Sequence, residues 1–305
     1  MSVRKVYTLI LFVLLVFPAK ALIVVTIPDF KPIIQDIVGD RDVVVSLTAG
    51  DPHSFSLSGK DVETLRKAKL IVLANSELFG FERKIAEEFD NTLDFKDYGV
   101  ELRDFPGYPK NPHGYWMDPK NAIAIARAVK EKLSEIYPQY ESEFDRNYEN
   151  FVKRVENAEK EAKKLVKGGK FVAMVPGVCY IASSLGIEVE NVLLSEGSGF
   201  SSGKELEMIK EKLRKGEIEG ILVPEFMKGS KGGEIAETLA KETGCKIAWV
   251  KFASGDLAYD TQLISNAARI AYAPKPCTSS DWAVYLLGSL CVFEALLIFV
   301  IKVGR

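Results

Sequence analysis

Short apolar runs alternate with amphipathic helical patterns along this chain, and that alternation limits the fold more than any other feature. Three runs in the first half are candidate strands: LIVVTI at residues 22–27, DVVVSL at 42–47 and LIVLAN at 70–75. Strands that are apolar on both faces are typical of parallel sheets covered by helices on each side. The sequence therefore predicts an α/β fold.

The same alternation returns in the second half of the chain, after residue 170. Four apolar runs are candidate strands: KFVAMV, IEVENVLL, IEGILV and KIAWVKF. Helices are predicted at residues 203–215, 231–242 and 259–273. No close internal repeat relates the two halves, so their similarity is architectural. We expect two Rossmann-like lobes, each built from a parallel sheet and helices.

One long amphipathic helix is predicted between the lobes, over residues 137–167. Its apolar residues recur at steps of three and four: Tyr140, Phe144, Tyr148, Phe151, Val155, Ala158, Ala162 and Leu165. A free coiled coil is the alternative, but a single apolar stripe more often packs along its own domain. We therefore expect a rigid spine that permits little hinge opening between the lobes.

Capping residues mark three predicted helix starts. Asp29 is predicted to cap the first helix. Ser58 opens the next one with Asp61 three residues later, which is a variant of the capping box. Asp118 is predicted to cap a third helix, with Pro119 at its first helical position.

Both ends of the chain are apolar. The first 21 residues combine basic residues, an apolar core and an Ala-Lys-Ala site, which predicts a cleaved signal peptide. A buried strand or an uncleaved anchor is the alternative. Residues 274–281 form a predicted tether, followed by a transmembrane helix at residues 282–302 with aromatic residues at its outer end and basic residues after it. Glu294 lies in this span, where a carboxyl group is either protonated or in contact with a membrane partner.

Charge and cysteine usage exclude two classes of protein. The net charge is -2 with basic residues dispersed among acidic ones, which argues against a nucleic-acid partner. The four cysteines are Cys179, Cys245, Cys277 and Cys291, and no Cys-x-x-Cys pair exists, which excludes a cysteine-rich zinc knuckle. If the chain is extracytoplasmic, one disulfide bond can form, but spacing does not reveal its connectivity.

His53 and His113 are the only histidines of the chain, and each directly follows a proline, in GDPHSF and NPHGYWMDP. Proline fixes its own φ and restricts the residue before it, so each histidine is carried on a stiff loop. Stiff loops suit metal ligands and catalytic bases. Two polar loop residues without a role are the alternative.

Four segments resemble the extracytoplasmic metal-binding proteins of zinc and manganese ABC transporters. They are TAGDPHSFSLSGKDVETLRKAKLIVLANSELFGFE, PHGYWMDPKNA, GILVPEF with AETLAKETGCKIA, and YDTQLISNAARIA. The resemblance covers residues 22–273. It implies a metal-binding N-terminal lobe at residues 22–136, a connecting helix at 137–168 and a C-terminal lobe at 169–273. It also implies a non-enzymatic receptor that captures a metal ion between the lobes and delivers it to an ABC permease.

The resemblance implies that His53 and His113 are metal ligands of the first lobe. Neutral imidazole suits zinc, and also manganese or iron when carboxylates complete the site. Val175 falls where the family has a third ligand, and valine cannot bind metal. The nearby Cys179 is expected to pack in the core instead.

Three acidic segments of the second lobe are candidates for the missing ligands. Asp256 is the first choice for the family's fourth ligand and Asp260 the second, although either could cap the final helix instead. Glu196 is a candidate substitute ligand, with a helix-entry role as the alternative. Glu225 ends a predicted strand and is expected near the cleft. The predicted metal site is therefore His53, His113, Asp256 and Glu196.

The sequence thus predicts a receptor for a divalent metal ion, zinc before manganese or iron, anchored on the extracytoplasmic face of the cell membrane. One alternative is a metal-dependent hydrolase, because a zinc site with an open position is typical of catalysis. No HExxH motif supports it. The other alternative, based on Val175, is a receptor-like module that has lost its metal.

Overall fold

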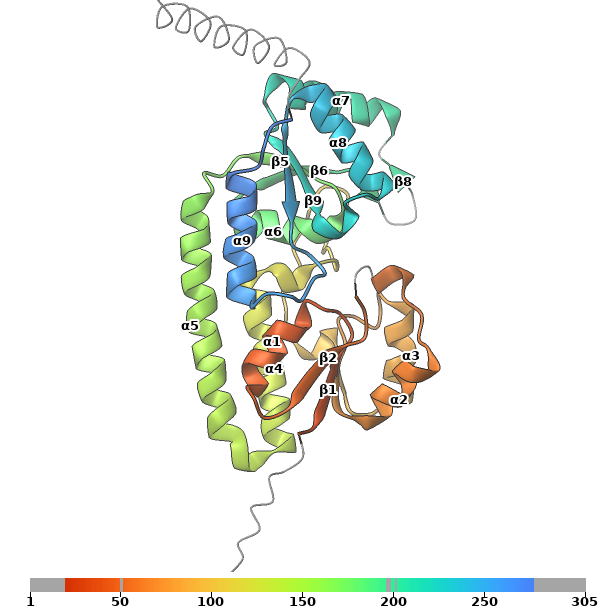
Figure 1. The fold of residues 1–305 in the computed structure, drawn as a ribbon, viewed down its shortest axis with the longest axis vertical. Helices are drawn as coiled ribbons and strands as arrows, with labels where there is room; N and C mark the ends of the chain where they lie inside the picture. Colours follow the sequence, from red (N-terminus) through yellow and green to blue (C-terminus); the bar gives the residue numbers. More distant parts are fainter. Residues whose placement is uncertain (1–19, 50–51, 196–198, 201, 277–305) are drawn as a thin grey trace, which may run out of the picture.

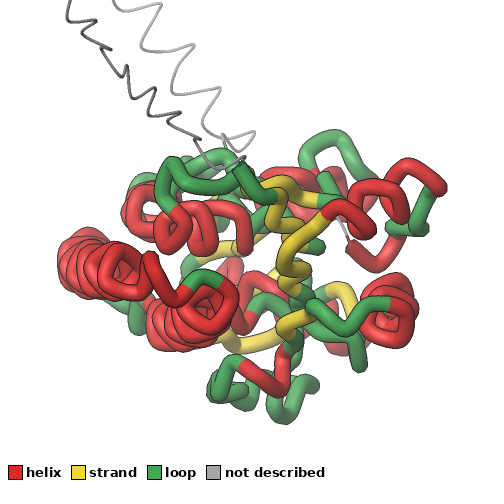
Figure 2. Tube along the Cα trace, turned by 90° about the horizontal axis from the view of Figure 1, so that it is seen from below, coloured by secondary structure: helices red, strands yellow, loops and turns green. Residues whose placement is uncertain are grey.

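The protein is built from two parallel sheets with flanking helices (Figure 1). Its structure is a computed structural model that describes residues 20–49, 52–195, 199–200 and 202–276. The predicted α/β class is confirmed: every pairing within the two four-stranded sheets is parallel. Seen from below, strands lie in the middle of the molecule and helices lie around them (Figure 2).

The first lobe is built on a sheet of order β2-β1-β3-β4. Its strands are β1 (Leu22–Val25), β2 (Val43–Ser46), β3 (Ala68–Val72) and β4 (Thr92–Leu93). Its helices are α1 (Phe30–Val38), α2 (Gly59–Lys67), α3 (Gly80–Glu88) and α4 (Pro119–Ile136). The first three strands coincide with the predicted apolar runs, whereas the two-residue β4 is too short to give a hydrophobic pattern.

The second lobe has a sheet of order β10-β9-β5-β6. Its strands are β5 (Lys170–Ala173), β6 (Glu188–Val192), β9 (Gly220–Pro224) and β10 (Lys246–Val250), with a small antiparallel pair of β7 (Leu194–Ser195) and β8 (Gly199–Phe200). Its helices are α6 (Cys179–Ser184), α7 (Gly203–Lys215), α8 (Lys231–Thr243) and α9 (Tyr259–Ala271). Every residue of β9 is buried, as expected for a central strand covered on both faces.

The spine is helix α5 (Glu141–Leu165), which runs past both lobes and lies beside α9 (Figure 1). Its buried face contains Phe144, Phe151, Val155, Ala158 and Ala162. The helix begins later than predicted, because Tyr137 precedes a proline and a residue in that position is disfavoured in helical conformation. A short 3-10 turn, Pro138–Tyr140, occupies the positions between Tyr137 and the start of α5.

Two of the three predicted helix caps are confirmed. The Ser58 side chain accepts a hydrogen bond from the Asp61 N–H, and the Asp61 carboxylate accepts one from the Ser58 N–H. Asp118 accepts from the N–H of Lys120 at the start of α4. The prediction for Asp29 was wrong: it occupies the cap position of α1, but its side chain makes no capping hydrogen bond. That carboxylate is bound elsewhere, as described below.

Residues 1–19 of the predicted signal peptide and the whole predicted transmembrane helix at residues 282–302 lie outside the described residues. Within the part of the chain that is described, no helix is long and apolar enough to cross a bilayer. Cys179 and Cys245 are buried free thiols, as expected for a packed Cys179. Cys277 and Cys291 lie outside the described residues.

Candidate metal centre

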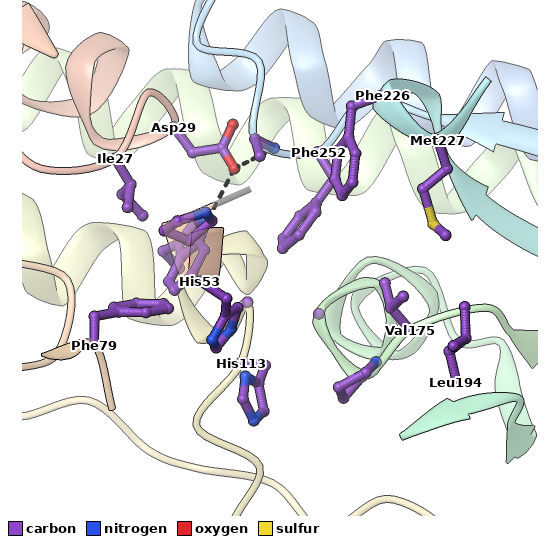
Figure 3. A pocket seen from close by; sticks show the side chains of 16 residues that line it. Ile27, Asp29, His53, Phe79, His113, Val175, Leu194, Phe226, Met227 and Phe252 are labelled. Atoms are coloured by element: carbon purple, nitrogen blue, oxygen red, sulfur yellow. Dashed lines mark hydrogen bonds between the residues drawn. The ribbon is translucent and has the colours of Figure 1, made fainter. Parts of the chain in front are cut away.

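A cavity of about 280 Å³ lies between the two lobes. Most of its lining residues follow the carboxyl ends of β1, β2 and β3 in the first lobe and of β5, β9 and β10 in the second. In parallel α/β folds, ligands bind at this edge of the sheet. Figure 3 shows both histidines on one side of this cavity, and the side chains of Val175 and Leu194 on the other.

The loops that follow two prolines bring His53 and His113 together. His53 lies in the 3-10 turn Pro52–Ser54, is exposed, and packs edge-on against Phe79 with ring centroids 4.8 Å apart. His113 is 9% exposed, and its backbone N–H donates to the side-chain oxygen of Asn111 at 3.0 Å. One ring is therefore open to solvent and the other is held in the interior.

The separation of the two imidazoles suits a shared metal ion. Their ring centroids lie 5.6 Å apart. Two imidazoles on one tetrahedral zinc ion, with Zn–N bonds of about 2 Å, have centroids roughly 5 Å apart. Two residues that are 60 positions apart in the sequence thus have a ring separation close to the one that a shared zinc ion requires.

The loop that carries His113 is tied to the second lobe. The Asn111 side-chain amide donates to the carbonyl oxygen of Pro176 at 2.9 Å, and the Tyr180 hydroxyl donates to the carbonyl oxygen of Asn111 at 2.7 Å. Asn111 is fully buried, so these bonds are shielded from water. The position of His113 therefore depends on the lobes staying together.

Asp29 is a carboxylate of the cavity that sequence reasoning placed only as a helix cap. It is 3% exposed, and it accepts hydrogen bonds from the Trp116 indole N–H at 3.0 Å and from the N–H groups of Ala253 and Ser254 at 2.7 and 3.1 Å. Burial raises the pKa of Asp29, while these hydrogen bonds oppose that rise. Asp29 therefore joins the first lobe to the loop after β10.

The ring of Trp116 extends this connection across the lobes. It stacks on Phe252, with centroids 5.9 Å apart and an angle of 9° between the ring planes. Because Trp116 also donates to Asp29, a hydrogen bond and an aromatic stack meet at one residue three positions after His113. No short sequence motif predicts this arrangement, because Asp29, Trp116 and Phe252 come from three separate segments of the chain.

The predicted ligand Asp256 does not line the cavity. Its carboxylate is bound to the Lys251 ammonium at 2.5 Å, and this hydrogen bond lowers the pKa of Asp256. The second choice, Asp260, lies on α9 and faces Arg154 at 3.6 Å. Neither residue is the cap of α9, since Ala258 occupies that position.

Of the two glutamate candidates, Glu225 lies among the described residues and Glu196 does not. The Glu225 carboxylate lies 2.9 Å from the Lys228 ammonium, and its pKa is lowered by that hydrogen bond and by Arg269 and Lys251. It lies at the end of β9, beside the cavity rather than in its lining. Glu196 lies outside the described residues, so it stays a prediction.

Val175 lines the cavity in the second lobe, where the family resemblance placed a ligand. Cys179, four positions later at the start of α6, is fully buried, and burial raises the pKa of its thiol to about 12. Such a thiol is protonated at neutral pH and is a poor metal ligand. Among the described residues, no group of three His, Cys, Asp or Glu side chains could hold a metal ion.

Comparisons with known proteins agree with this fold. The model of a family described as "Zinc-uptake complex component A periplasmic" (ZnuA) matches residues 23–271. A putative metal-binding protein of Thermotoga maritima is 29% identical over 249 residues, which cover 80% of this chain and 88% of that protein. The metal ABC transporter substrate-binding lipoprotein SloC of Streptococcus mutans is 23% identical, covering 75% of this chain and 79% of SloC.

Two further similarities carry less functional weight. The zinc-binding protein AdcA of Streptococcus pyogenes is 22% identical over 75% of this chain, but the match spans only 50% of AdcA. A crystal structure of ZnuA superposes with a TM-score of 0.69 at 19% identity, covering 83% of this chain and 99% of that one. At that identity the superposition shows a shared fold alone.

Proposed function

Because the chain belongs to the ZnuA family of periplasmic zinc-uptake components, we propose that it captures a divalent transition metal ion between its lobes and delivers it to an ABC permease. Zinc is the first candidate, since imidazole ligands suit it and the family is described by zinc uptake. Manganese and iron are the alternatives. SloC, described as the substrate-binding lipoprotein of a metal ABC transporter, supports the transport role.

The observation that carries this proposal is the pairing of His53 and His113 in the lining of one interlobe cavity, 5.6 Å apart between ring centroids. Histidines are rare in this chain, and both of them line the same cavity. A receptor is favoured over a hydrolase because the family is described by zinc uptake, and because the carboxylate of the described lining, Asp29, is already engaged by three hydrogen bonds.

Two second-lobe ligands remain predictions. Asp256 could reach an ion only after its bond to Lys251 breaks. Glu196 is tested separately, because it lies outside the described residues. We further propose that the mature protein is held on the extracytoplasmic face of the membrane by residues 282–302.

The test is metal binding by histidine variants. We expect His53→Ala and His113→Ala each to weaken zinc affinity at least tenfold, measured by calorimetry on the full chain. Glu196→Gln and Asp256→Asn, measured alongside, decide whether either carboxylate contributes. Unchanged zinc affinity in both histidine variants would contradict the assignment of the site.

A further inference from the structure

The second-lobe wall of the cavity is apolar among the described residues. Its larger side chains are those of Val175, Leu194, Phe226, Met227 and Phe252, and the small residues Pro176, Gly177 and Ala253 complete it. The two histidines and the carboxylate of Asp29 all belong to the first lobe. Asp29 already accepts three hydrogen bonds. One side of this cavity therefore offers metal ligands, and the opposite side offers hydrocarbon and aromatic surface with the Met227 thioether, a soft group that does not suit zinc as imidazole does (Figure 3).

Such a wall does not suit an aqueous metal ion. Zinc in proteins is almost always four-coordinate, so two imidazoles leave two positions to fill. Water molecules in those positions would face apolar side chains, and an ion that loses hydration without new ligands is strongly disfavoured. A group that donates to the metal on one side and is apolar on the other would satisfy both halves of the cavity.

The size of the cavity and an exposed aromatic residue also favour a ligand that is larger than a metal ion and partly apolar. A volume of about 280 Å³ far exceeds a single ion, since an apolar cavity of about 150 Å³ already holds benzene. Phe226 is 43% exposed, and its ring lies 6.4 Å from that of Phe252 between centroids. A large exposed aromatic residue that lines a cavity is typical of a binding surface.

We propose that the cargo is a metal ion already held by a small bidentate organic chelator with an aromatic body, not the aqueous ion. In this complex His53 and His113 supply two ligands, the chelator supplies two, and its ring packs against Phe226, Phe252 and Val175. This inference rests on the proposed function, because it uses the same two histidines. It differs in assigning the second-lobe half of the cavity to the organic body of the cargo.

The test compares three probes on the full chain in detergent, with protein-free micelles as the blank. They are aqueous zinc, zinc premixed one to one with 1,10-phenanthroline, and zinc premixed one to one with 8-hydroxyquinoline. We expect at least one complex to bind at least tenfold more tightly than aqueous zinc. The isomer 1,7-phenanthroline, which has the same shape but cannot chelate, is expected to bind at least tenfold more weakly than the preferred complex.

Two variants locate the chelator. Phe226→Ser should lower the preference for the complex over aqueous zinc at least threefold, whereas Met208→Ser, at an exposed apolar residue of α7 outside the cavity lining, should leave it unchanged. Val175→Glu, which adds a carboxylate to the wall, should reverse the preference toward aqueous zinc.

The outcomes separate this inference from the proposed function. If aqueous zinc binds as tightly as both complexes, or if Glu196→Gln abolishes tight binding of aqueous zinc, the chelate proposal is wrong and the metal receptor stands. Equal binding of 1,7-phenanthroline would overturn the chelate proposal in favour of an apolar solute. If aqueous zinc binds and loss of both histidines leaves its affinity unchanged, the proposed function itself is wrong.

Discussion

The backbones of Gly114 and Gly177 meet across the two lobes, so closely that a β-carbon on Gly114 would lie 2.1 Å from the carbonyl oxygen of Gly177. Gly114 follows His113 directly and has φ of 73°. Gly177 lies in the 3-10 turn Pro176–Val178, directly after the segment that carries Val175. The two walls of the cavity are therefore in backbone contact beside the histidine pair.

We predict that Gly114→Ala forces these two backbones apart. It combines a positive-φ penalty with a steric overlap that no flexible side chain can relieve. Gly107→Ala is the matched control, because Gly107 has φ of 77° and no atom within 4 Å of an added β-carbon. Gly114→Ala should destabilise the protein by roughly 2 kcal/mol more than the control and weaken zinc affinity, measured by urea unfolding and calorimetry. Equal losses in both variants would show that the contact is dispensable.

The layout of strands and helices was predictable from the sequence because it depends on local patterns. Apolar runs, the Ser58 capping box and the Asp118-Pro119 start each involve residues that are neighbours in the chain. The period of the apolar residues likewise predicted the buried face of α5. The late start of that helix is also local, since it follows from the proline after Tyr137.

The tertiary contacts around the cavity were not predictable in the same way. Asp29 was placed as a cap because the residue before a helix often serves that role, but its tertiary partners Trp116, Ala253 and Ser254 compete successfully for its carboxylate. Two of those partners are more than 220 residues away along the chain. Asp256 was chosen by its position after β10, and sequence alone could not show its ion pair with Lys251.

The spine is joined to both lobes by Arg154, which lies 2.6 Å from the Asp36 carboxylate on α1 and 3.6 Å from the Asp260 carboxylate on α9. Arg154→Met keeps the apolar stem of the side chain and removes the cation. It leaves two partly buried carboxylates close together without their counter-charge, so we expect a loss of about 1–3 kcal/mol. Urea unfolding measures it, since urea does not screen charges.

Arg146→Met provides the control for this change, because Arg146 is an exposed arginine of the same helix. It is expected to alter the free energy of unfolding by less than about 0.5 kcal/mol. Raising the salt concentration should also narrow the difference between wild type and Arg154→Met. A difference that is insensitive to salt would show that packing, not charge, accounts for the loss.

The proposed membrane anchor gives a third prediction. Truncation before Trp282 should release the protein from the membrane, because the removed segment contains the predicted apolar span. Fractionation of cells that express the full and truncated chains measures this directly, and an Ala19→Arg variant tests the predicted signal cleavage site in parallel. If the truncated chain stays with the membrane, the anchor is the N-terminal segment instead.

Stability should fall as the pH rises from about 4.5 to 7, with Glu82 a main cause. This residue of α3 is fully buried, and burial raises its pKa from 4.5 to about 7, although the N–H groups of Ala74 and Asn75 donate to its carboxylate. Nearby Asp94 raises this pKa further. In that pH range the folded protein keeps a proton that the unfolded chain releases, so stability is greatest below pH 4.5 and declines by up to about 3 kcal/mol by pH 7.

Glu82→Gln tests this cause. Glutamine does not titrate, so the variant should lose much of the decline between pH 4.5 and 7 while being less stable than wild type at acidic pH, because its amide group cannot accept from both N–H groups. Glu87→Gln, at an exposed residue of the same helix, should retain the wild-type slope. Urea unfolding at several pH values measures all three proteins, and an unchanged slope in Glu82→Gln would assign the effect to two other carboxylates with raised pKa, the buried Asp29 and the partly buried Asp36.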